Sequence, residues 1–352
     1  MRMHLFGLGR AEKQLTPKRR KLEGVTKKPR RAVDRGFLSF VRARSFFRKL
    51  LHGKDVEELE SKHPVKWSVV EHRGAKTDVF YIGPKAPKNK VLIVPGNPGC
   101  AEWYVSFARA IEDKTLSNDT GIYGLSLLGH SLRNVNDWRR TFSVEDQIEI
   151  TEQLARDIKP SVLVGHSFGA HVCSQVLKRY NELMPRSSVV LLMPLTQCAR
   201  RMTTTMKFSL HQHVREIITS GTRLVTANIP LRFGRAVVRA MGLNENAEIA
   251  LSRMAGCLPL FRNIIYLADD ERKQIKGFEF DLFRSMQGRV FYYHVQNDMW
   301  DTKDAFEEYR RELGDDGTVD DKFGTEHAFV LRDEQVERVA SAVSSFIDDR
   351  RQ

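Results

Sequence analysis

One serine of the 352-residue chain stands in a pattern that is typical of a catalytic nucleophile. The pentapeptide Gly165-His-Ser167-Phe-Gly169 follows the apolar run Ser161–Val164 and precedes a segment that we expect to be helical. A serine on a sharp turn from strand to helix has a strained backbone, and bulky residues two positions away would clash. We therefore predict that Ser167 is a nucleophile for acyl transfer. A serine in an ordinary tight turn is the alternative interpretation of these five residues.

A second serine begins in the same way but lacks the rest of the pattern. The segment Gly129-His130-Ser131 is followed two residues later by Arg133 instead of a glycine, and polar residues come next. We therefore reject Ser131 as the nucleophile and expect only that His130 lines the pocket.

A serine nucleophile needs a general base near the end of the domain. His327 lies in the loop Gly324–Phe329, directly before the last predicted helix, Asp333–Ile347, and no other histidine follows Asp298. In hydrolases with a nucleophile elbow, the catalytic residues follow the chain order serine, acid, histidine. We predict that His327 takes the proton of Ser167, whereas a surface loop histidine is the alternative.

The base in turn needs a carboxylate that orients its imidazole. Asp298 lies just past the predicted strand Val290–Val295, where a side chain can reach the histidine, and Asp301 is the reserve candidate. The corresponding segment after the preceding strand, Met193–Gln197, contains no carboxylate. The sequence therefore predicts a Ser-Asp-His triad with Asp298 as its acid.

Two backbone N–H groups should stabilise the oxyanion of such a reaction. One comes from Phe168, the residue after the nucleophile. The other should come from the loop Val94–Gly99, in which Pro98 has no N–H, so we predict Asn97 as the second donor. An ordinary turn between a strand and a helix is the alternative interpretation of this loop.

The elements that must position these residues alternate between strands and helices. Apolar runs predict buried strands, and amphipathic segments between them predict helices, so we expect a mostly parallel sheet with helices on both faces, the α/β-hydrolase fold. The predicted strands are Trp67–Val70, Asp78–Ile82, Val91–Val94, Gly121–Leu127, Ser161–Val164, Val189–Leu192 and Val290–Tyr293, and the first predicted helices are Glu102–Glu112 and Ser143–Ile158.

The alternation is interrupted once, and this interruption divides the chain. Between 196 and 288 the pattern is helical, which we interpret as a cap inserted over the active site, so that residues 60–195 and 289–352 form the two halves of the hydrolase core. Apolar patches in the cap can contact lipid or simply form its own core.

Residues 1–55 form a basic tail. The whole chain carries a formal charge of +13, but Met1–Lys54 contains 17 basic and 3 acidic residues, so the remainder is nearly neutral. We expect much of the tail to be disordered, with an amphipathic helix over Phe37–Leu51 that suits an anionic membrane surface. The alternatives are a helix packed on the domain, an organelle transit segment or a nuclear localisation signal.

Other classes of function find little support in the sequence. There is no nucleotide-binding glycine motif after a strand and no P-loop, so we expect no cofactor. The four cysteines are scattered without CxxC spacing, which argues against a zinc site and a disulfide framework. Because the body is neutral and lacks a recognition motif, we expect no specific nucleic-acid partner.

Taken together, these motifs resemble the lipid droplet-associated hydrolase family from about Val91 to Val330. The residues that carry the resemblance are Val91–Gly99, Gly129-His130, Val144–Gln147, Gly165–Ala170, Tyr292-Tyr293, Asn297–Trp300 and Glu326–Phe329. The Pro-Gly-Asn-Pro-Gly loop is the most specific of them. Two features depart from the family pattern: Asn-Asp-Met-Trp stands where Thr/Ser-Asp-Pro-Trp is expected, and the basic tail is additional.

The resemblance implies an activity and a location. It implies a serine esterase or lipase-like hydrolase that acts on cholesteryl or acylglycerol esters at lipid droplets or the endoplasmic reticulum membrane. The basic tail leaves a mitochondrial location open. A protein that binds the droplet or membrane surface and has weak or no turnover is the alternative function.

Overall fold

The computed structural model describes residues 62–350, except 138, 181–183, 198–201, 212–241, 255–256 and 287. The predicted basic tail, 1–55, lies outside the described residues, as does the middle of the predicted cap. The chain from Glu60 onward forms one compact unit. Among the described helices, none combines the length and the apolar character that a membrane span requires.

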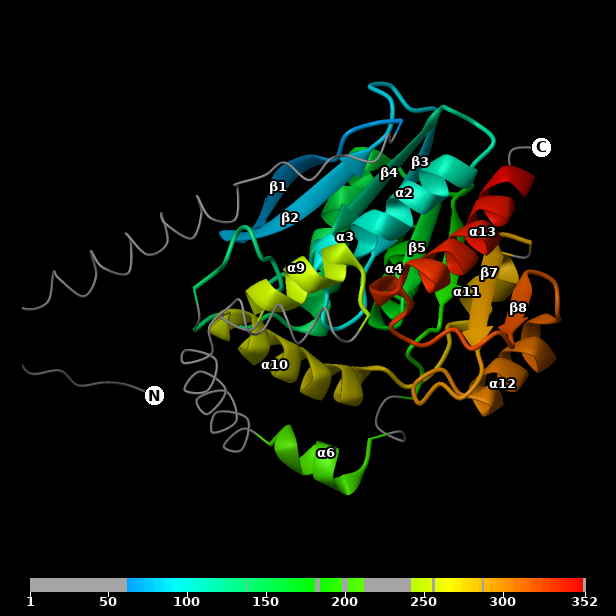
Figure 1. The fold of residues 1–352 in the computed structure, drawn as a ribbon. Helices are drawn as coiled ribbons and strands as arrows, with labels where there is room; N and C mark the ends of the chain where they lie inside the picture. Colours follow the sequence, from blue (N-terminus) through cyan, green and yellow to red (C-terminus); the bar gives the residue numbers. More distant parts are fainter. Residues whose placement is uncertain are drawn as a thin grey trace, which may run out of the picture. The chain divides into compact units, whose positions relative to one another are not determined.

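The described elements are built around a sheet of eight strands in the order β1-β2-β4-β3-β5-β6-β7-β8 (Figure 1). The pairs β1/β2 and β2/β4 are antiparallel, and all other neighbouring pairs are parallel. The strands are β1 Lys66–His72, β2 Ala75–Ile82, β3 Asn89–Val94, β4 Thr120–Leu125, β5 Val162–His166, β6 Ser188–Leu192, β7 Val290–Val295 and β8 Thr318–Asp321.

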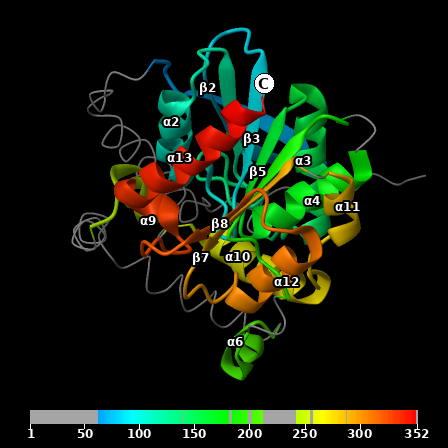
Figure 2. The ribbon, with the colours of Figure 1, turned by 90° about the vertical axis from the view of Figure 1, so that its right-hand side faces the viewer.

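Helices cover both faces of this sheet. Alternate residues of the central strands point to opposite faces, so each face presents apolar side chains on which helices can pack. In β3, Leu92 and Val94 pack into one apolar cluster, whereas Val91 and Ile93 pack into the other. The first cluster includes residues of α3 (Val144–Ile158), α4 (Phe168–Tyr180), α11 (Phe280–Ser285) and α12 (Lys303–Leu313); the second includes residues of η1 (Ala101–Tyr104), α2 (Val105–Lys114), η2 (Phe329–Leu331) and α13 (Asp333–Asp349). Figure 2 shows α2 and α13 on one side of the sheet and α3, α4 and α11 on the other. The predicted α/β-hydrolase architecture is thus confirmed.

The described elements between β6 and β7 are helices joined by loops. It contains α6 (Thr204–Ser209), α9 (Glu245–Met254), α10 (Leu258–Gln274) and α11. Figure 1 shows α9 and α10 next to each other, and α10 also contacts α3. The core therefore meets this inserted segment through α9, α10 and α11.

The start of α3 shows how local sequence fixes an element. Ser143 accepts a hydrogen bond from the Asp146 backbone N–H, and the Asp146 carboxylate accepts one from the Ser143 backbone N–H at 2.7 Å. This capping box satisfies donors that the first turn leaves free, so the helix begins where the sequence predicts.

Candidate active site

Ser167 lies on a tight turn between β5 and α4, as the motif predicts. Its φ is 54°, in the left-handed region that an L-residue seldom adopts. Hydrogen bonds hold this conformation: the Ser167 N–H donates to the Leu192 carbonyl at 2.8 Å, and its carbonyl accepts from the N–H groups of Ala170 and Leu195, each at 3.1 Å. The turn is therefore fixed by the sheet on one side and by α4 on the other.

The two glycines of the motif are required by close packing. A Cβ added at Gly165 would lie 2.5 Å from the Ala170 Cα, and one added at Gly169 would lie 2.1 Å from the Val94 carbonyl oxygen. The backbone of α4 therefore approaches the ends of β3 and β5 more closely than a side chain allows.

The loop after β3 packs directly on this turn. A Cβ at Gly96 would lie 3.0 Å from the Ser167 Cβ. Among the described residues, no acceptor binds the backbone N–H of Asn97 or that of Phe168. These are the two groups predicted to form the oxyanion hole, and unpaired donors beside a serine are what such a hole requires.

Asp298 and His327 form a hydrogen-bonded pair. The Nδ1 atom of His327 lies 2.5 Å from Oδ2 of Asp298, whose side chain is fully buried, whereas that of His327 is 25 % exposed. The other carboxylate oxygen of Asp298 accepts from the N–H groups of Trp300 and Asp301 at 2.7 and 3.1 Å. With Nδ1 donating to the carboxylate, Nε2 is left to accept a proton.

The surroundings keep Asp298 ionised. Burial alone would raise the pKa of this carboxyl group. The hydrogen bond and the charge of His327, together with the two backbone donors, outweigh burial and hold the pKa below its ordinary value. Asp298 is therefore negatively charged where it contacts His327.

Asp301, the reserve candidate for the acid, has different partners. Its carboxylate contacts the Tyr292 hydroxyl and lies 2.9 Å from Nδ1 of His294, and all three residues are buried. Burial raises the pKa of Asp301 to about 6, against the opposing hydrogen bond of His294. Asp301 thus anchors the loop that carries Asp298 and does not pair with His327.

His166 connects the turn of Ser167 to the loop of His327. Its Nδ1 lies 2.6 Å from the Tyr104 hydroxyl, which also accepts the Gly96 N–H at 3.1 Å, and its Nε2 lies 2.9 Å from the His327 carbonyl oxygen. The rings of His166 and His327 are 5.1 Å apart. Burial lowers the pKa of His166 to about 3, so its imidazole is neutral. The turn of Ser167, the loop Val94–Gly99 and the loop of His327 therefore share one hydrogen-bonded chain.

The residues of the rejected second motif have structural partners. Ser131 is buried and its hydroxyl binds the Asp78 carboxylate, whose other oxygen accepts from Asn134 at 2.5 Å. His130 is fully buried, and its Nδ1 accepts the Gly99 N–H at 2.8 Å. His130 therefore holds the loop Val94–Gly99 at Gly99.

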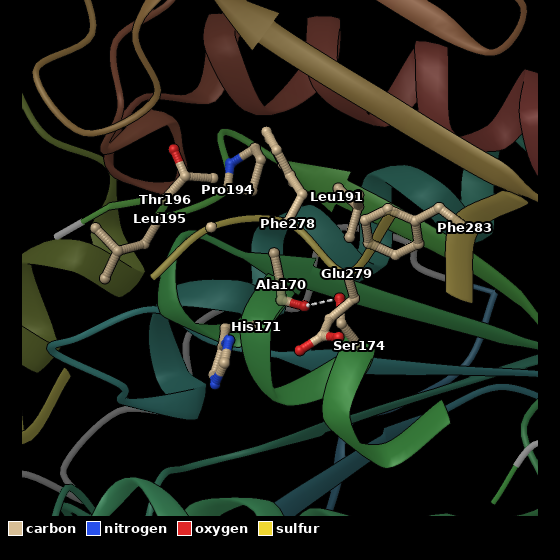
Figure 3. Close-up of a pocket in the computed structure, with 11 residues that line it drawn as sticks. Ala170, His171, Ser174, Leu191, Pro194, Leu195, Thr196, Phe278, Glu279 and Phe283 are labelled. Atoms are coloured by element: carbon tan, nitrogen blue, oxygen red, sulfur yellow. Dashed lines mark hydrogen bonds between the residues drawn. The ribbon is translucent and has the colours of Figure 1, made fainter. Parts of the chain in front are cut away.

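A small cavity adjoins the first turns of α4. Its interior volume is about 20 Å³, which is room for roughly one water molecule. Figure 3 shows the side chains around it, and its apolar members are Ala170, Leu191, Pro194, Leu195, Phe278 and Phe283. Two of these, Ala170 and Leu195, bind the Ser167 carbonyl through their N–H groups, so the cavity lies beside the nucleophile turn.

A family model described as lipid-droplet associated hydrolase matches residues 87–330. The chain belongs to this family. A lipid droplet-associated hydrolase of Dictyostelium discoideum is 26% identical over 291 residues, which cover 77% of this chain and 92% of that relative. The human lipid droplet-associated hydrolase is 23% identical over 285 residues, which cover 73% of this chain and 87% of that relative.

Solved structures share the fold of this lipid droplet-associated hydrolase family member. A bacterial membrane phospholipase A superposes with a TM-score of 0.56 at 16% identity and covers 91% of this chain and 96% of its own. A haloalkane dehalogenase of Bradyrhizobium elkani superposes with a TM-score of 0.57 at 11% identity, and the match covers 82% of this chain and 99% of the dehalogenase. At these identities the likeness establishes the α/β-hydrolase fold and nothing about the substrate.

The structure adds residues that the sequence did not single out. Tyr104 and His166 support the loops of the site, and Glu271 of α10 lies beside Asn97 of the loop Val94–Gly99. His166 is the only one with a signal in the sequence, because it occupies the first variable position of the nucleophile motif.

Proposed function

We propose that this family member hydrolyses carboxylic esters of lipids with Ser167 as nucleophile, His327 as base and Asp298 as acid. The observation that carries the proposal is the hydrogen bond of 2.5 Å between His327 and the buried Asp298, beside a serine held in a left-handed turn. Family membership supports a hydrolase, and the geometry supports the serine mechanism.

In the first half of the reaction, Ser167 Oγ attacks the ester carbonyl carbon while Nε2 of His327 takes its proton. The carbonyl oxygen becomes an oxyanion that accepts hydrogen bonds from the N–H groups of Asn97 and Phe168. The tetrahedral intermediate collapses when His327 gives its proton to the leaving alcohol, and an acyl-serine remains.

In the second half, water attacks the acyl-serine, and His327 accepts one proton of that water. The same two N–H groups stabilise the second oxyanion. Collapse returns the proton to Ser167 Oγ and releases the fatty acid. Asp298 holds the imidazole in the required tautomer and balances its charge throughout.

Cholesteryl and acylglycerol esters are the substrates that we propose. Apolar side chains gather around the small cavity beside the nucleophile turn, which suits an apolar substrate near Ser167, and we propose the segment 196–288 as the cap over this site. Because the relatives carry the name lipid droplet-associated hydrolase, we propose the droplet surface, or the endoplasmic reticulum membrane, as the location.

A fluorophosphonate probe tests the catalytic assignment, because it reacts covalently with an activated serine whatever the natural substrate. We expect the purified protein to be labelled, Ser167→Ala to be unlabelled and Ser131→Ala to be labelled like the wild type. Ser131→Ala is the matched control, because Ser131 also follows a Gly-His pair and is buried. Folded wild type that takes up no probe would contradict the enzyme proposal.

A surface-binding protein with weak turnover is the second candidate, and the predicted basic amphipathic helix favours it. Turnover of cholesteryl oleate and triolein emulsions by wild type and Ser167→Ala separates the two functions. Droplet association that is retained together with labelling, but without release of fatty acid, would favour the second candidate. Imaging of fluorescent fusions with and without residues 1–55 tests the tail: unchanged targeting would remove its proposed role, and mitochondrial targeting that depends on it would support the alternative address.

A further inference from the structure

Helix α10 holds the proposed oxyanion loop, Val94–Gly99, through the side chain of Asn97. The Asn97 Nδ2 donates to the Ile264 carbonyl oxygen at 3.0 Å, and the same side chain lies close enough to the Glu271 carboxyl group to lower its pKa. Ile264 and Glu271 are seven residues apart, about two helical turns, and therefore lie on the same face of α10. Asn97 is thus bonded to this face of α10 and lies beside Glu271 on it.

Glu271 is an unusual residue to find in this position. It is only 5 % exposed, and its Oε1 has no hydrogen-bond partner among the described residues; the same is true of Oδ1 of Asn97. An ionised carboxylate that is buried without a cationic partner is strongly disfavoured. Burial accordingly raises the pKa of Glu271 to about 8, and the charge of Asp270 adds to this, although the nearby Asn97 amide opposes it.

Within the part of the chain that the structure describes, the charged groups near Glu271 supply no counter-ion. On α10 itself, Asp269 is paired with Arg272 and Lys273, each at 2.5 Å. Asp270 accepts the Val144 N–H of α3 at 2.8 Å.

From the loop after β4, His130 faces α10 at the Asn263 backbone, and burial lowers its pKa to about 3. The His130 imidazole is therefore neutral and supplies no positive charge. Glu271 consequently stays uncharged at neutral pH.

We propose that Glu271 is a positioning residue for ester hydrolysis: through the Asn97 side chain, its carboxyl group holds the Asn97 backbone N–H in place for the oxyanion. This inference rests on the proposed function, because it requires the Asn97 N–H to be an oxyanion donor. The uncharged form suits that role, since it orients the loop without placing a negative charge beside the developing oxyanion. The ionised form opposes the reaction electrostatically.

The proposal predicts an alkaline limb in the pH profile that belongs to Glu271. As pH rises through about 8, the carboxyl group loses its proton, and we expect kcat to fall with little change in KM. Glu271→Gln keeps the shape and stays neutral, so it should retain activity at pH 7 within about threefold and lose the limb. Glu271→Ala frees the Asn97 side chain and should lower kcat at pH 7 by about 10- to 100-fold.

Asp270→Asn gives an independent test that leaves Glu271 intact. Its negative charge raises the pKa of Glu271, so its removal should move the alkaline limb to lower pH. The Asn side chain can still accept the Val144 N–H. The matched control is Glu248→Gln on α9, another buried carboxylate, which should leave the profile unchanged.

The experiment measures kcat and KM for p-nitrophenyl butyrate from pH 6.5 to 9.5, together with the rate of fluorophosphonate labelling and the melting temperature of each variant. A Glu271→Gln profile with the wild-type limb, an Asp270→Asn limb that does not move, or a Glu271→Ala variant with wild-type kcat would each overturn the role of Glu271. Failure of wild type to label at Ser167 would instead overturn the proposed function. If Glu271→Ala folds poorly, the Glu271→Gln and Asp270→Asn variants still test the role of Glu271.

Discussion

The Nε2 atom of His166 lies 2.9 Å from the backbone carbonyl oxygen of His327, so the residue directly before the proposed nucleophile also holds the loop of the proposed base. Its Nδ1 accepts from Tyr104, whose hydroxyl accepts the Gly96 N–H. Only this assignment gives every member a donor and an acceptor while the imidazole is neutral. The three loops that meet at Ser167 are therefore fixed relative to one another by a side chain that itself needs no charge.

The Tyr104 hydroxyl should matter for both stability and rate. Tyr104→Phe leaves the buried Gly96 N–H and His166 Nδ1 without partners, which should lower the free energy of unfolding by about 1–3 kcal/mol. The oxyanion loop should also lose its fixed position, so that fluorophosphonate labelling slows by about tenfold. Urea denaturation and labelling kinetics check the two effects. Tyr309→Phe, in a buried tyrosine of α12, is the control, and an equal loss of labelling in both variants would contradict the role of Tyr104.

Buried neutral histidines should make the fold sensitive to acid. Burial lowers the pKa of His130 and His166 to about 3 and that of His171 to about 4, whereas an unfolded imidazole titrates near 6.5. Between about pH 6.5 and 4, the unfolded chain therefore binds protons that the folded chain does not. The free energy of unfolding should fall as pH falls through this range, by up to about 1.4 kcal/mol per pH unit for each histidine.

Urea denaturation at pH 7, 6 and 5 measures this slope. His130→Gln, which can still accept the Gly99 N–H, should flatten it. If His130→Gln and wild type lose stability in parallel on acidification, His130 does not titrate as proposed.

Substitutions of Asp298 and Asp301 should have different effects: one should lower activity and the other should lower stability. Asp298→Asn removes the charge that His327 needs and should lower kcat by about 10⁴-fold, with little loss of stability. Asp301→Ala leaves Tyr292 and His294 without their buried partner and should cost about 2–4 kcal/mol of stability, with only about a tenfold loss of kcat. Thermal melting and ester hydrolysis measure both quantities. The opposite pattern, an inactive but stable Asp301→Ala, would assign the acid to Asp301.

The sequence predicted the parts of this site that depend on local chain order. The nucleophile turn lies between a strand and a helix that are adjacent in sequence, and buried parallel strands such as β3 and β6 are recognisable as apolar runs. The edge strand β8 was missed, because Thr318-Val-Asp-Asp321 is polar and needs only one partner strand.

Residues that act across the fold could not be found in this way. Asp269-Asp-Glu271 is a run of acidic residues in the sequence, and only the packing of α10 against Asn97 determines that Glu271 faces inward. Likewise, nothing local indicates that Asp301 pairs with His294, because the choice between Asp298 and Asp301 depends on where the loop of His327 lies. Expectations for 1–55 concern residues outside the described structure.

The last prediction concerns Gly169, whose backbone lies close to the end of β3. A Cβ at Gly169 would lie 2.1 Å from the Val94 carbonyl oxygen and 2.7 Å from that of Pro95, and neither backbone atom can turn aside as a side chain can. Gly169→Ala must therefore move the start of α4 away from the end of β3, which should cost at least about 3 kcal/mol and abolish labelling of Ser167. Gly277→Ala is the matched control, because a Cβ there meets no atom within 4 Å, and its stability should stay within about 0.5 kcal/mol of wild type. Equal melting temperatures for the two variants would mean that α4 can shift without cost, and the tight contact between the nucleophile turn and the oxyanion loop would then not be what holds Ser167 in place.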